Sequence, residues 1–451
     1  MYKSKISNIV ITSIFAASIS SFAYGNDIYG PFPITEKSYS GDKTNSVSYT
    51  GQIARHVLHD SLKKIVGTEA TTNIKQMNLD KMMPYFEGSD SDLSILAPAT
   101  KGDFVVKQKM VNEISSGKNL SGKSYKGIVN GWPGNMTGSE VLASMLDKAA
   151  DTSNGFDANT GYDYIQLISK FAMGAVFYNQ AVDNYLDEKL AADNKPNDKP
   201  YKDGAYYTGK EHVWDEAFGY WGAAAHGLTL SAEQNYNITK MKDFAAADYN
   251  KDGVVDLKSE FNFAHAYYAS GYDKGGKTNY YSTITKAFID GRKIITEANG
   301  EKLSSAQRSE LYVLRDIIVN NWEKVIAESV FKYAGSVYKD LEKLETIMES
   351  GGDSSKAFRT YAKHWGELKG FALALQTGKT NLGETAVKLN RMMGYGPVLL
   401  NASQVTGVDS NGNFMKDQGQ EWGEYKLHML KIQKLMIDVF NVQARSNDKL
   451  A

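Results

Sequence analysis

A short segment of the chain carries oxygen-bearing side chains at alternating positions. Residues 248–256 read D-x-N-x-D-G-x-x-D. A hard cation such as Ca2+ needs several oxygen ligands on a tightly turned loop, and Gly253 permits the required bend. The expected ligands are Asp248, Asn250, Asp252, the main-chain carbonyl of Val254, and Asp256. The spacing therefore predicts an EF-hand-like calcium loop.

The end of this loop departs from the EF-hand pattern. Position twelve, where a bidentate Glu normally completes the site, is Ser259, and Glu260 follows one residue later. We expect Glu260 to serve as the last ligand if the following helix starts one residue late. Otherwise water fills the position, and the affinity falls toward the millimolar range of extracellular modules. The alternative is a turn rich in Asp and Asn between two helices, with no cation.

A second pattern, W-x-E-x-x-G followed by an aromatic residue, occurs at 214–220 and again at 365–371. His212 lies four residues before Glu216, and His364 lies three residues before Glu367. Either spacing places the imidazole and the carboxylate on one helix face. Because facing helices of a bundle can build a metal site in this way, we expect these four residues to share a transition-metal site, such as Fe or Zn. The alternative is a local hydrogen bond beside a buried tryptophan in each helix.

Three more residues are candidates for the same site. His56 and His59 are three residues apart and share a helix face, and Asp215 is an additional acid in the first pattern. The alternative is that these residues have purely structural or surface roles. The chain has no cysteine, which excludes thiolate metal sites, thiol nucleophiles and disulfides.

The composition argues against nucleic-acid binding. The 451 residues include 51 Lys and Arg against 52 Asp and Glu, so the formal charge is −1 and there is no basic excess to hold a phosphate backbone. Neither G-x-S-x-G nor a phosphate-binding Walker loop is present.

The N-terminus predicts export. Lys3 and Lys5 precede an apolar stretch of about 15 residues, which is shorter than the roughly 20 that a spanning helix needs. Ala23 and Gly25 place small residues at −3 and −1 of a cleavage site, so residues 1–25 are expected to be a signal peptide. The mature chain would begin at Asn26, carry no transmembrane segment, and reside in the periplasm or outside the cell.

The elements that must position these residues are helices. Apolar residues recur at helical spacing throughout the mature chain, and no hairpin of alternating strands is evident. The expected helices are 52–66, 139–149, 162–192, 210–225, 257–269, 283–298, 304–348, 356–376, 384–393 and 420–444. The segment 409–413 is expected to be a turn and not a second cation loop.

The fold class is therefore all-α, with two packed helical bundles. The 151-residue offset between the two tryptophan patterns favours an internal duplication, with chance similarity as the alternative. Glycine inside a helix costs about 1 kcal/mol relative to alanine, so the glycines of the patterns are expected to be points of close helix approach. The expected units are an arm at 26–50 that is mobile or draped over the surface, lobe one at 51–246, the calcium helix-loop-helix at 247–276, and lobe two at 277–451.

The segments 55–60, 212–220, 248–260 and 363–371 together resemble the bacterial DUF4856 family over nearly the whole mature chain. The chain is also similar to the imelysin-like group of secreted, duplicated helical bundles. That group carries G-x-H-x-x-E, is associated with iron uptake and was once described as peptidases. His364 and Glu367 fit H-x-x-E, but Ala362 stands where the signature has Gly, and Asp215 stands three residues after His212.

We accordingly expect a non-enzymatic exported binding protein that is stabilised by Ca2+ and holds a metal or a metal-bearing ligand between two lobes. An outer-membrane or uptake protein would be its partner. Two alternatives remain. One is a metal-dependent hydrolase or peptidase with Glu216 or Glu367 as general base. The other is a calcium-stabilised structural or surface protein without a pocket.

Overall fold

The computed structural model describes residues 27–89, 92–192 and 194–450, so the expected signal peptide lies outside the described residues. The described residues form thirteen α-helices and two small antiparallel sheets, which confirms the all-α class. The helices are α1 Thr50–Thr68, α2 Lys75–Phe86, α3 Gly138–Ala149, α4 Tyr164–Ala172, α5 Gly209–Trp221, α6 Ala232–Thr239, α7 Phe244–Ala247, α8 Ala264–Asp273, α9 Tyr280–Glu297, α10 Ser305–Glu349, α11 Ser355–Leu375, α12 Gly383–Met393 and α13 Trp422–Phe440. Three short 3-10 turns lie at Val111–Glu113, Ser121–Lys123 and Gly227–Thr229.

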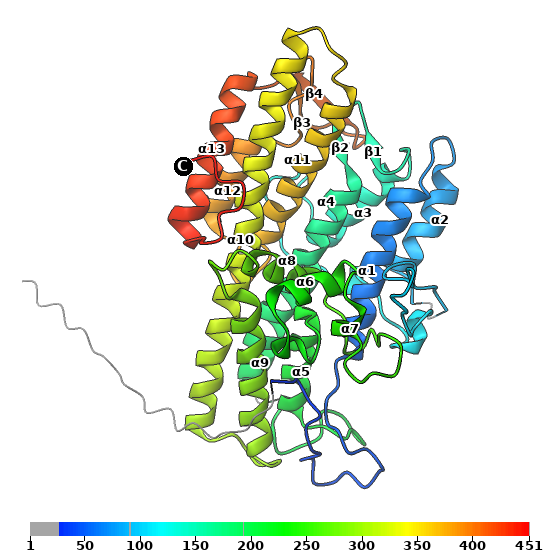
Figure 1. Ribbon diagram of the computed structural model, residues 1–451, viewed down its shortest axis with the longest axis vertical. Coiled ribbons are helices and arrows are strands. Elements are labelled where there is room, and N and C mark those ends of the chain that lie inside the picture. The colour runs from blue at the N-terminus through cyan, green and yellow to red at the C-terminus, as the bar shows by residue number, and fades with distance from the viewer. Residues whose placement is uncertain (1–26, 90–91, 193, 451) are drawn as a thin grey trace, which may run out of the picture.

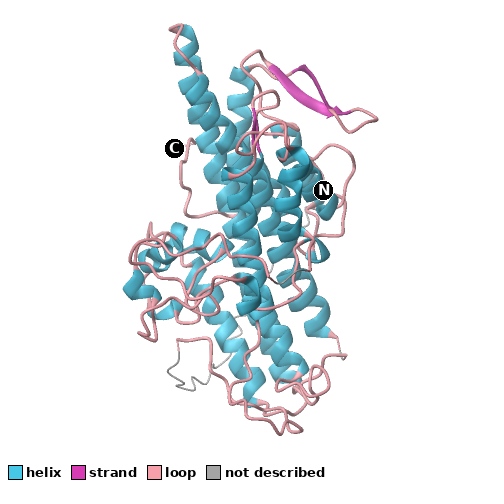
Figure 2. Cartoon of the chain, turned by 90° about the vertical axis from the view of Figure 1, so that its right-hand side faces the viewer, coloured by secondary structure: helices cyan, strands magenta, loops and turns pink. Residues whose placement is uncertain are grey.

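Two long helical segments run along the molecule (Figures 1 and 2). One is α10, which packs against α9, α11 and α13. The other begins as α4 and continues through two π-helical stretches, η3 at Met173–Tyr178 and η4 at Gln180–Lys189. Its α4 half packs against α11, and its η4 half packs against α5. The two helices that carry the tryptophan patterns, α11 and α5, therefore pack against different halves of the same long segment.

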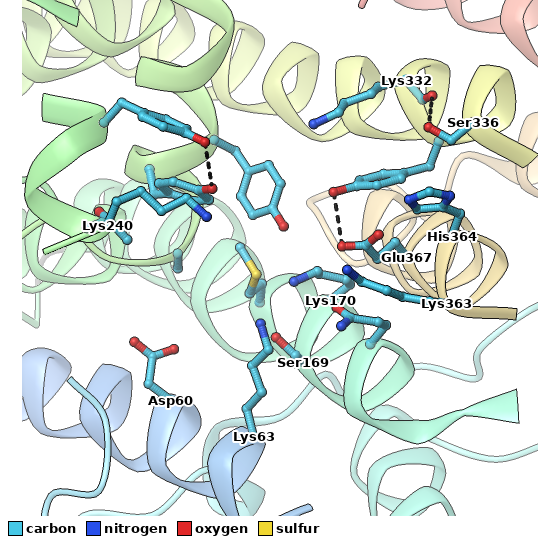
Figure 3. A pocket seen from close by; sticks show the side chains of 18 of the residues that line it. Asp60, Lys63, Ser169, Lys170, Lys240, Lys332, Ser336, Lys363, His364 and Glu367 are labelled. Atoms are coloured by element: carbon cyan, nitrogen blue, oxygen red, sulfur yellow. Dashed lines mark hydrogen bonds between the residues drawn. The ribbon is translucent and has the colours of Figure 1, made fainter. Parts of the chain in front are cut away.

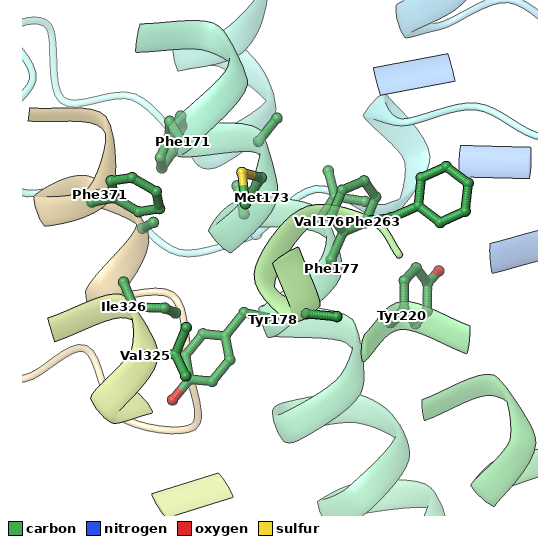
Figure 4. Packing of buried hydrophobic residues seen from close by; sticks show 14 of the residues in the cluster. Phe171, Met173, Val176, Phe177, Tyr178, Tyr220, Phe263, Val325, Ile326 and Phe371 are labelled. Carbon is green, nitrogen blue, oxygen red and sulfur yellow. The ribbon is translucent and has the colours of Figure 1, made fainter. Parts of the chain in front are cut away.

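The π-helical stretch lies in the middle of the core. Phe177 and Tyr178 are buried there, beside Phe263, Tyr220 and Val325 (Figure 4). Extended π-helix is rare, and its wider turns rotate successive side chains differently from an α-helix. The change of helical pitch accompanies the change of packing partner from α11 to α5.

The tryptophans of both patterns are buried anchors of the core, as expected. Trp214 and Trp365 are fully buried, and their indole nitrogens donate to the Phe288 carbonyl and the Tyr425 hydroxyl at 2.7 and 2.6 Å. A Cβ on Gly370 would lie 2.6 Å from the Cβ of Lys170, which confirms this glycine as a point of close approach between α11 and α4.

The expected division into two lobes does not appear as two separate cores among the described residues. One buried cluster extends from Tyr29 to Val442. Helices α4 and α5 of the expected first lobe pack against α11 and α9 of the expected second lobe. None of the helices in the described part of the chain combines the length and the apolar character needed to cross a membrane.

Both ends of the described chain are fastened by buried carboxylates. In the irregular arm, Tyr29 donates to Asp215 at 2.7 Å, so the arm lies against α5 and is held there. After α13, the main-chain N–H groups of residues 443–445 donate to the carboxylate of Glu328, which is fully buried on α10. The alternative of a draped arm is thus the one that the structure supports.

The strands are few and peripheral. Strands β1 (Phe156–Asp157) and β2 (Tyr162–Asp163) form a minimal pair, and β3 (Ser403–Val408) and β4 (Phe414–Gln418) form a hairpin. The sequence pattern predicted no hairpin, and this expectation was wrong. The hairpin was missed because the β4 side chains are largely exposed and show no alternation of apolar residues. The segment 409–413 is the turn of this hairpin, as expected.

Candidate functional site

A cavity of about 890 Å3 lies where α1, α4, α6, α8, α10 and α11 meet. Large concave pockets with converging polar groups are the usual places for ligand binding. Seven lysines and three carboxylates line this cavity, a formal excess of four positive charges in a chain that is almost neutral overall. The lysines are Lys63, Lys170, Lys240, Lys332, Lys339, Lys343 and Lys363, and the acids are Asp60, Asp340 and Glu367.

Two of the lysines point toward one another across the cavity floor (Figure 3). Lys63 extends from α1, and Lys170, only 3% exposed, extends from α4. The positive charge of Lys170, together with burial, lowers the pKa of Lys63 to about 7. Burial also lowers the pKa of Lys170, although the nearby Glu367 opposes this shift. The two ammonium groups therefore repel one another, and the pair favours an anion.

Tyrosines form the adjoining wall of the cavity. The Tyr236 and Tyr267 rings are stacked with centroids 5.0 Å apart, and Tyr268 lies edge-on to Tyr267 at 5.1 Å. The Lys170 ammonium lies 5.5 Å from the centre of the Tyr268 ring. Such cation–π contacts keep the charge of a partly desolvated lysine close to an apolar surface. The wall therefore offers ring faces and hydroxyls beside the paired lysines.

Several of the expected site residues line this cavity. His364 bonds through Nδ1 to Asp340 at 2.6 Å, and Glu367 accepts a hydrogen bond from Tyr333 at 3.1 Å. His59 faces the same cavity, but its two ring nitrogens are engaged with Asp60 at 2.9 Å and the Ser169 carbonyl at 3.0 Å. His59 is therefore not free to ligate a metal.

The other His–Glu pair lies elsewhere. His212 and Glu216, with Nε2 and Oε2 3.6 Å apart, line a separate cavity of about 360 Å3. Burial lowers the pKa of His212 to about 4. The structure does not bring the two pairs into one site, which corrects the expectation of a shared metal centre. The physical reason is that α5 packs against η4, whereas α11 packs against α4.

The remaining candidates have structural roles. His56 is buried between Phe177 and Phe263, with Nε2 3.1 Å from the Gly219 carbonyl, and burial lowers its pKa to about 3. Asp215 accepts the 2.9 Å hydrogen bond of Arg292. Within the described ranges, no group of three or more His, Asp or Glu side chains is arranged to hold a metal ion.

The segment 248–260, which was expected to bind Ca2+, is a closed, hydrogen-bonded turn. The two carboxylate oxygens of Asp248 accept from the N–H groups of Asp252 and Gly253 at 3.1 and 3.0 Å. Glu260 closes the loop, because its carboxylate accepts from the N–H groups of Asn250 and Asp256 at 3.2 and 2.7 Å. Burial raises the pKa of Glu260, and the charges of Asp256 and Asp248 add to the rise.

The surroundings of the loop differ from those of an EF-hand. Residues 257–263 are not helical, and the next helix begins at Ala264, seven residues after the start expected for it. Val255 instead forms a β-bridge to Val106 of a neighbouring loop. The Lys107 ammonium lies 3.4 Å from a carboxylate oxygen of Asp252 and 3.7 Å from one of Asp256, where it neutralises part of the acidic charge.

The lysine-lined cavity was not evident from the sequence. Its lysines lie on helices or at a helix end, from residue 63 to residue 363, without a common motif, and isolated lysines of this kind are normally solvated. The one available signal was Lys170, which stands among apolar residues in the otherwise buried helix 164–172.

A family model described as Domain of unknown function (DUF4856) matches residues 35–388, more than half of the chain. No curated protein and no solved structure matches the chain.

Proposed function

The chain belongs to the DUF4856 family, and we propose that it is an exported, non-enzymatic binding protein that captures an anionic ligand in the lysine-lined cavity. The observation that carries this proposal is the pairing of Lys63 and Lys170 on the cavity floor. Two facing ammonium groups with lowered pKa values are a cost to the unliganded protein, and an anion between them would relieve it. Export is inferred from the signal-peptide pattern of residues 1–25.

The charge of the cavity bears on the metal expectation. A bare cation is repelled by the excess of lysines, whereas an anionic chelate that carries a metal is attracted. We therefore propose that any metal, iron included, arrives inside a negatively charged ligand. Both ring nitrogens of His59 are engaged, so the cavity offers few free metal ligands. This favours binding over a metal-dependent hydrolase, which usually needs three protein ligands and an open position.

The test is a thermal-shift and calorimetric screen of the mature protein. Small carboxylates, phosphates and sulfates would be compared with Zn2+ and with neutral sugars. We expect anions to raise the melting temperature and 0.5 M NaCl to weaken the effect, because salt screens charge. Binding should weaken in Lys63→Met and persist in Lys286→Met, whose lysine is exposed on α9. A protein that binds Zn2+ but none of the anions would overturn the proposal.

We also propose that Ca2+ occupies the loop 248–260 and stabilises the fold. Three aspartates and Glu260 lie on this one loop, and Lys107 is the ion-pair partner of Asp252 and Asp256 there. The residues that would hold the ion are Asp248, Asn250, Asp252, the Val254 carbonyl, Asp256 and Glu260. Ca2+ would neutralise these carboxylates and fix the loop against the Val106 bridge.

A further inference from the structure

We propose that the ligand carries a doubly charged head group, such as a phosphate monoester, which lies between Lys63 and Lys170, and that its organic part lies along the tyrosine wall. This inference rests on the proposed function, because it names the ligand class of the same cavity. Phosphate monoesters and compact dicarboxylates both present a doubly charged head group, and titration with malonate distinguishes between these two ligand classes.

The charge balance of the cavity floor favours a dianion over a monoanion. Figure 3 labels five lysines of the cavity, which are Lys63, Lys170, Lys240, Lys332 and Lys363, and two of its carboxylates, which are Asp60 and Glu367. Asp60 is already hydrogen-bonded to His59, and Glu367 already accepts from Tyr333. The five lysines against two acids leave a formal excess of three positive charges, and a dianion would neutralise more of this excess than a monoanion.

The tyrosine wall continues beyond the floor. A smaller cavity of about 190 Å3 shares Tyr236, Tyr267, Tyr268, Lys332 and Tyr333 with the main one. Ring faces and hydroxyls bind flat organic groups by stacking and hydrogen bonding. An organic group attached to the head therefore has an aromatic surface to lie on, whereas the floor itself is charged.

A head group of charge −2 would also hold both lysines in their protonated forms. Lys63 loses its proton readily, because the charge of Lys170 and burial lower its pKa to about 7. The titratable and charged groups that line the cavity around the pair are His59 and Asp60 on α1, Tyr236 on α6, Lys240 directly after α6, Tyr267 and Tyr268 on α8, Lys332, Tyr333, Lys339, Asp340 and Lys343 on α10, and Lys363, His364 and Glu367 on α11. Binding near pH 7.5 should therefore take up protons from the buffer.

The experiment compares phenyl phosphate with phenyl sulfate by titration calorimetry of the full mature chain at pH 7.5. The two probes have similar shapes, but the first is mainly a dianion and the second a monoanion. We expect phenyl phosphate to bind at least tenfold more tightly. We also expect its binding heat to differ between phosphate-free buffers of low and high ionisation enthalpy, which reports proton uptake. Methyl phosphate tests the tyrosine wall and should bind more weakly than phenyl phosphate, and malonate tests the dicarboxylate source.

Variants assign the effect to the lysine pair. Lys63→Met and Lys170→Met should each reduce the preference for phenyl phosphate to less than threefold and remove the proton uptake. Lys343→Met, at the exposed rim of the same cavity, should weaken both probes alike. Melting curves check that each variant folds, and having two floor variants keeps the test decisive if one does not fold.

Different outcomes would refute the dianionic head group and the anion-binding function separately. Equal affinity for phenyl phosphate and phenyl sulfate would refute the dianionic head and leave the anion-binding function standing. A preference that survives in both floor variants would also refute it. Failure of these probes and of every anion in the screen would refute the proposed function as well. Tighter binding of malonate than of both phosphates would assign the head group to a dicarboxylate.

Discussion

The buried ion-pair network beneath the N-terminal arm gives the most direct test of the fold. The Arg292 side chain is fully buried, and it donates to Glu211 at 3.1 Å, to Asp215 at 2.9 Å and to Ser46 at 2.6 Å. Both carboxylates are also fully buried. Replacement of Arg292 by Met would therefore leave two buried acids without their counter-ion.

Removal of one partner of a buried ion pair typically costs 3–5 kcal/mol. Because one guanidinium serves two carboxylates here, we expect Arg292→Met to lower the free energy of unfolding by about 4 kcal/mol at pH 7.5. Burial already raises the pKa of Asp215 to about 6 while Arg292 opposes the rise, so without the arginine this pKa should rise further above its unfolded value. The folded variant then binds more protons than the unfolded chain, so its deficit relative to wild type should shrink as the pH falls from 7.5 toward 5.

Urea unfolding followed by far-UV circular dichroism measures the loss, and limited proteolysis reports release of the arm. Lys286→Met, an exposed position of the same helix, is the matched control and should change stability little. The triple variant that adds Glu211→Gln and Asp215→Asn should recover part of the loss, because it removes the unpaired charges. A loss below about 1 kcal/mol, or a deficit that grows at pH 5, would refute the reasoning.

Four further predictions concern other parts of the molecule. The melting temperature of the wild type should be higher in Ca2+ than in chelator, because Ca2+ at a hundredfold excess over Kd adds about 2.7 kcal/mol to the free energy of unfolding. Asp252→Ala should abolish this response. A wild-type melting temperature that does not change with Ca2+ would rule out the site. Lys107→Ala should strengthen Ca2+ binding in calorimetry, because its ammonium competes for the same carboxylates; weaker binding would contradict this. Burial lowers the pKa of Lys369 to about 7, so between pH 7 and about 10.5 the unfolded chain binds one more proton than the folded protein. The free energy of unfolding should therefore rise with pH in this range, by at most about 1.4 kcal/mol per pH unit. Denaturation at several pH values measures this rise, and Lys369→Met should remove it. Gly370→Ala should cost about 1–3 kcal/mol by denaturant unfolding, because its Cβ would overlap the Cβ of Lys170, and a neutral effect would show that α11 can move.

A prediction outside the described residues concerns export. N-terminal sequencing of exported protein should give Asn26, because small residues occupy −3 and −1 of the cleavage site before it. Material that still begins with Met1 would contradict it.

The helices were predictable where apolar spacing is continuous. Helices α10 and α11 and the long segment that starts at Tyr164 follow the expected ranges closely, because burial of one face imposes a strict period. Helix α2 carries a proline and few buried residues, so its pattern is weak. Helix α8 begins seven residues late, because residues 257–263 are anchored by long-range contacts such as the hydrogen bond from the Phe263 N–H to the Gly222 carbonyl.

The candidate site was less predictable than the fold. The residues of the two His–Glu pairs were correctly placed on helix faces, but which helices face each other depends on packing between distant segments. Apart from Lys170, the cavity lysines carried no local signal, because each is by itself an ordinary polar residue of a helix or a helix end. Only the tertiary arrangement turns seven separate lysines into one electrostatic surface.

The anchoring of Glu328 has a consequence for how the protein is made. Its buried carboxylate is satisfied by main-chain N–H groups of residues 443–445, more than a hundred positions further along the chain. Until that segment has been synthesised, the middle of α10 holds an acid with too few donors, and closing the core around it is unfavourable. A nascent chain should thus stay open until synthesis is nearly finished. That delay suits a protein expected to pass through a translocation channel before it folds.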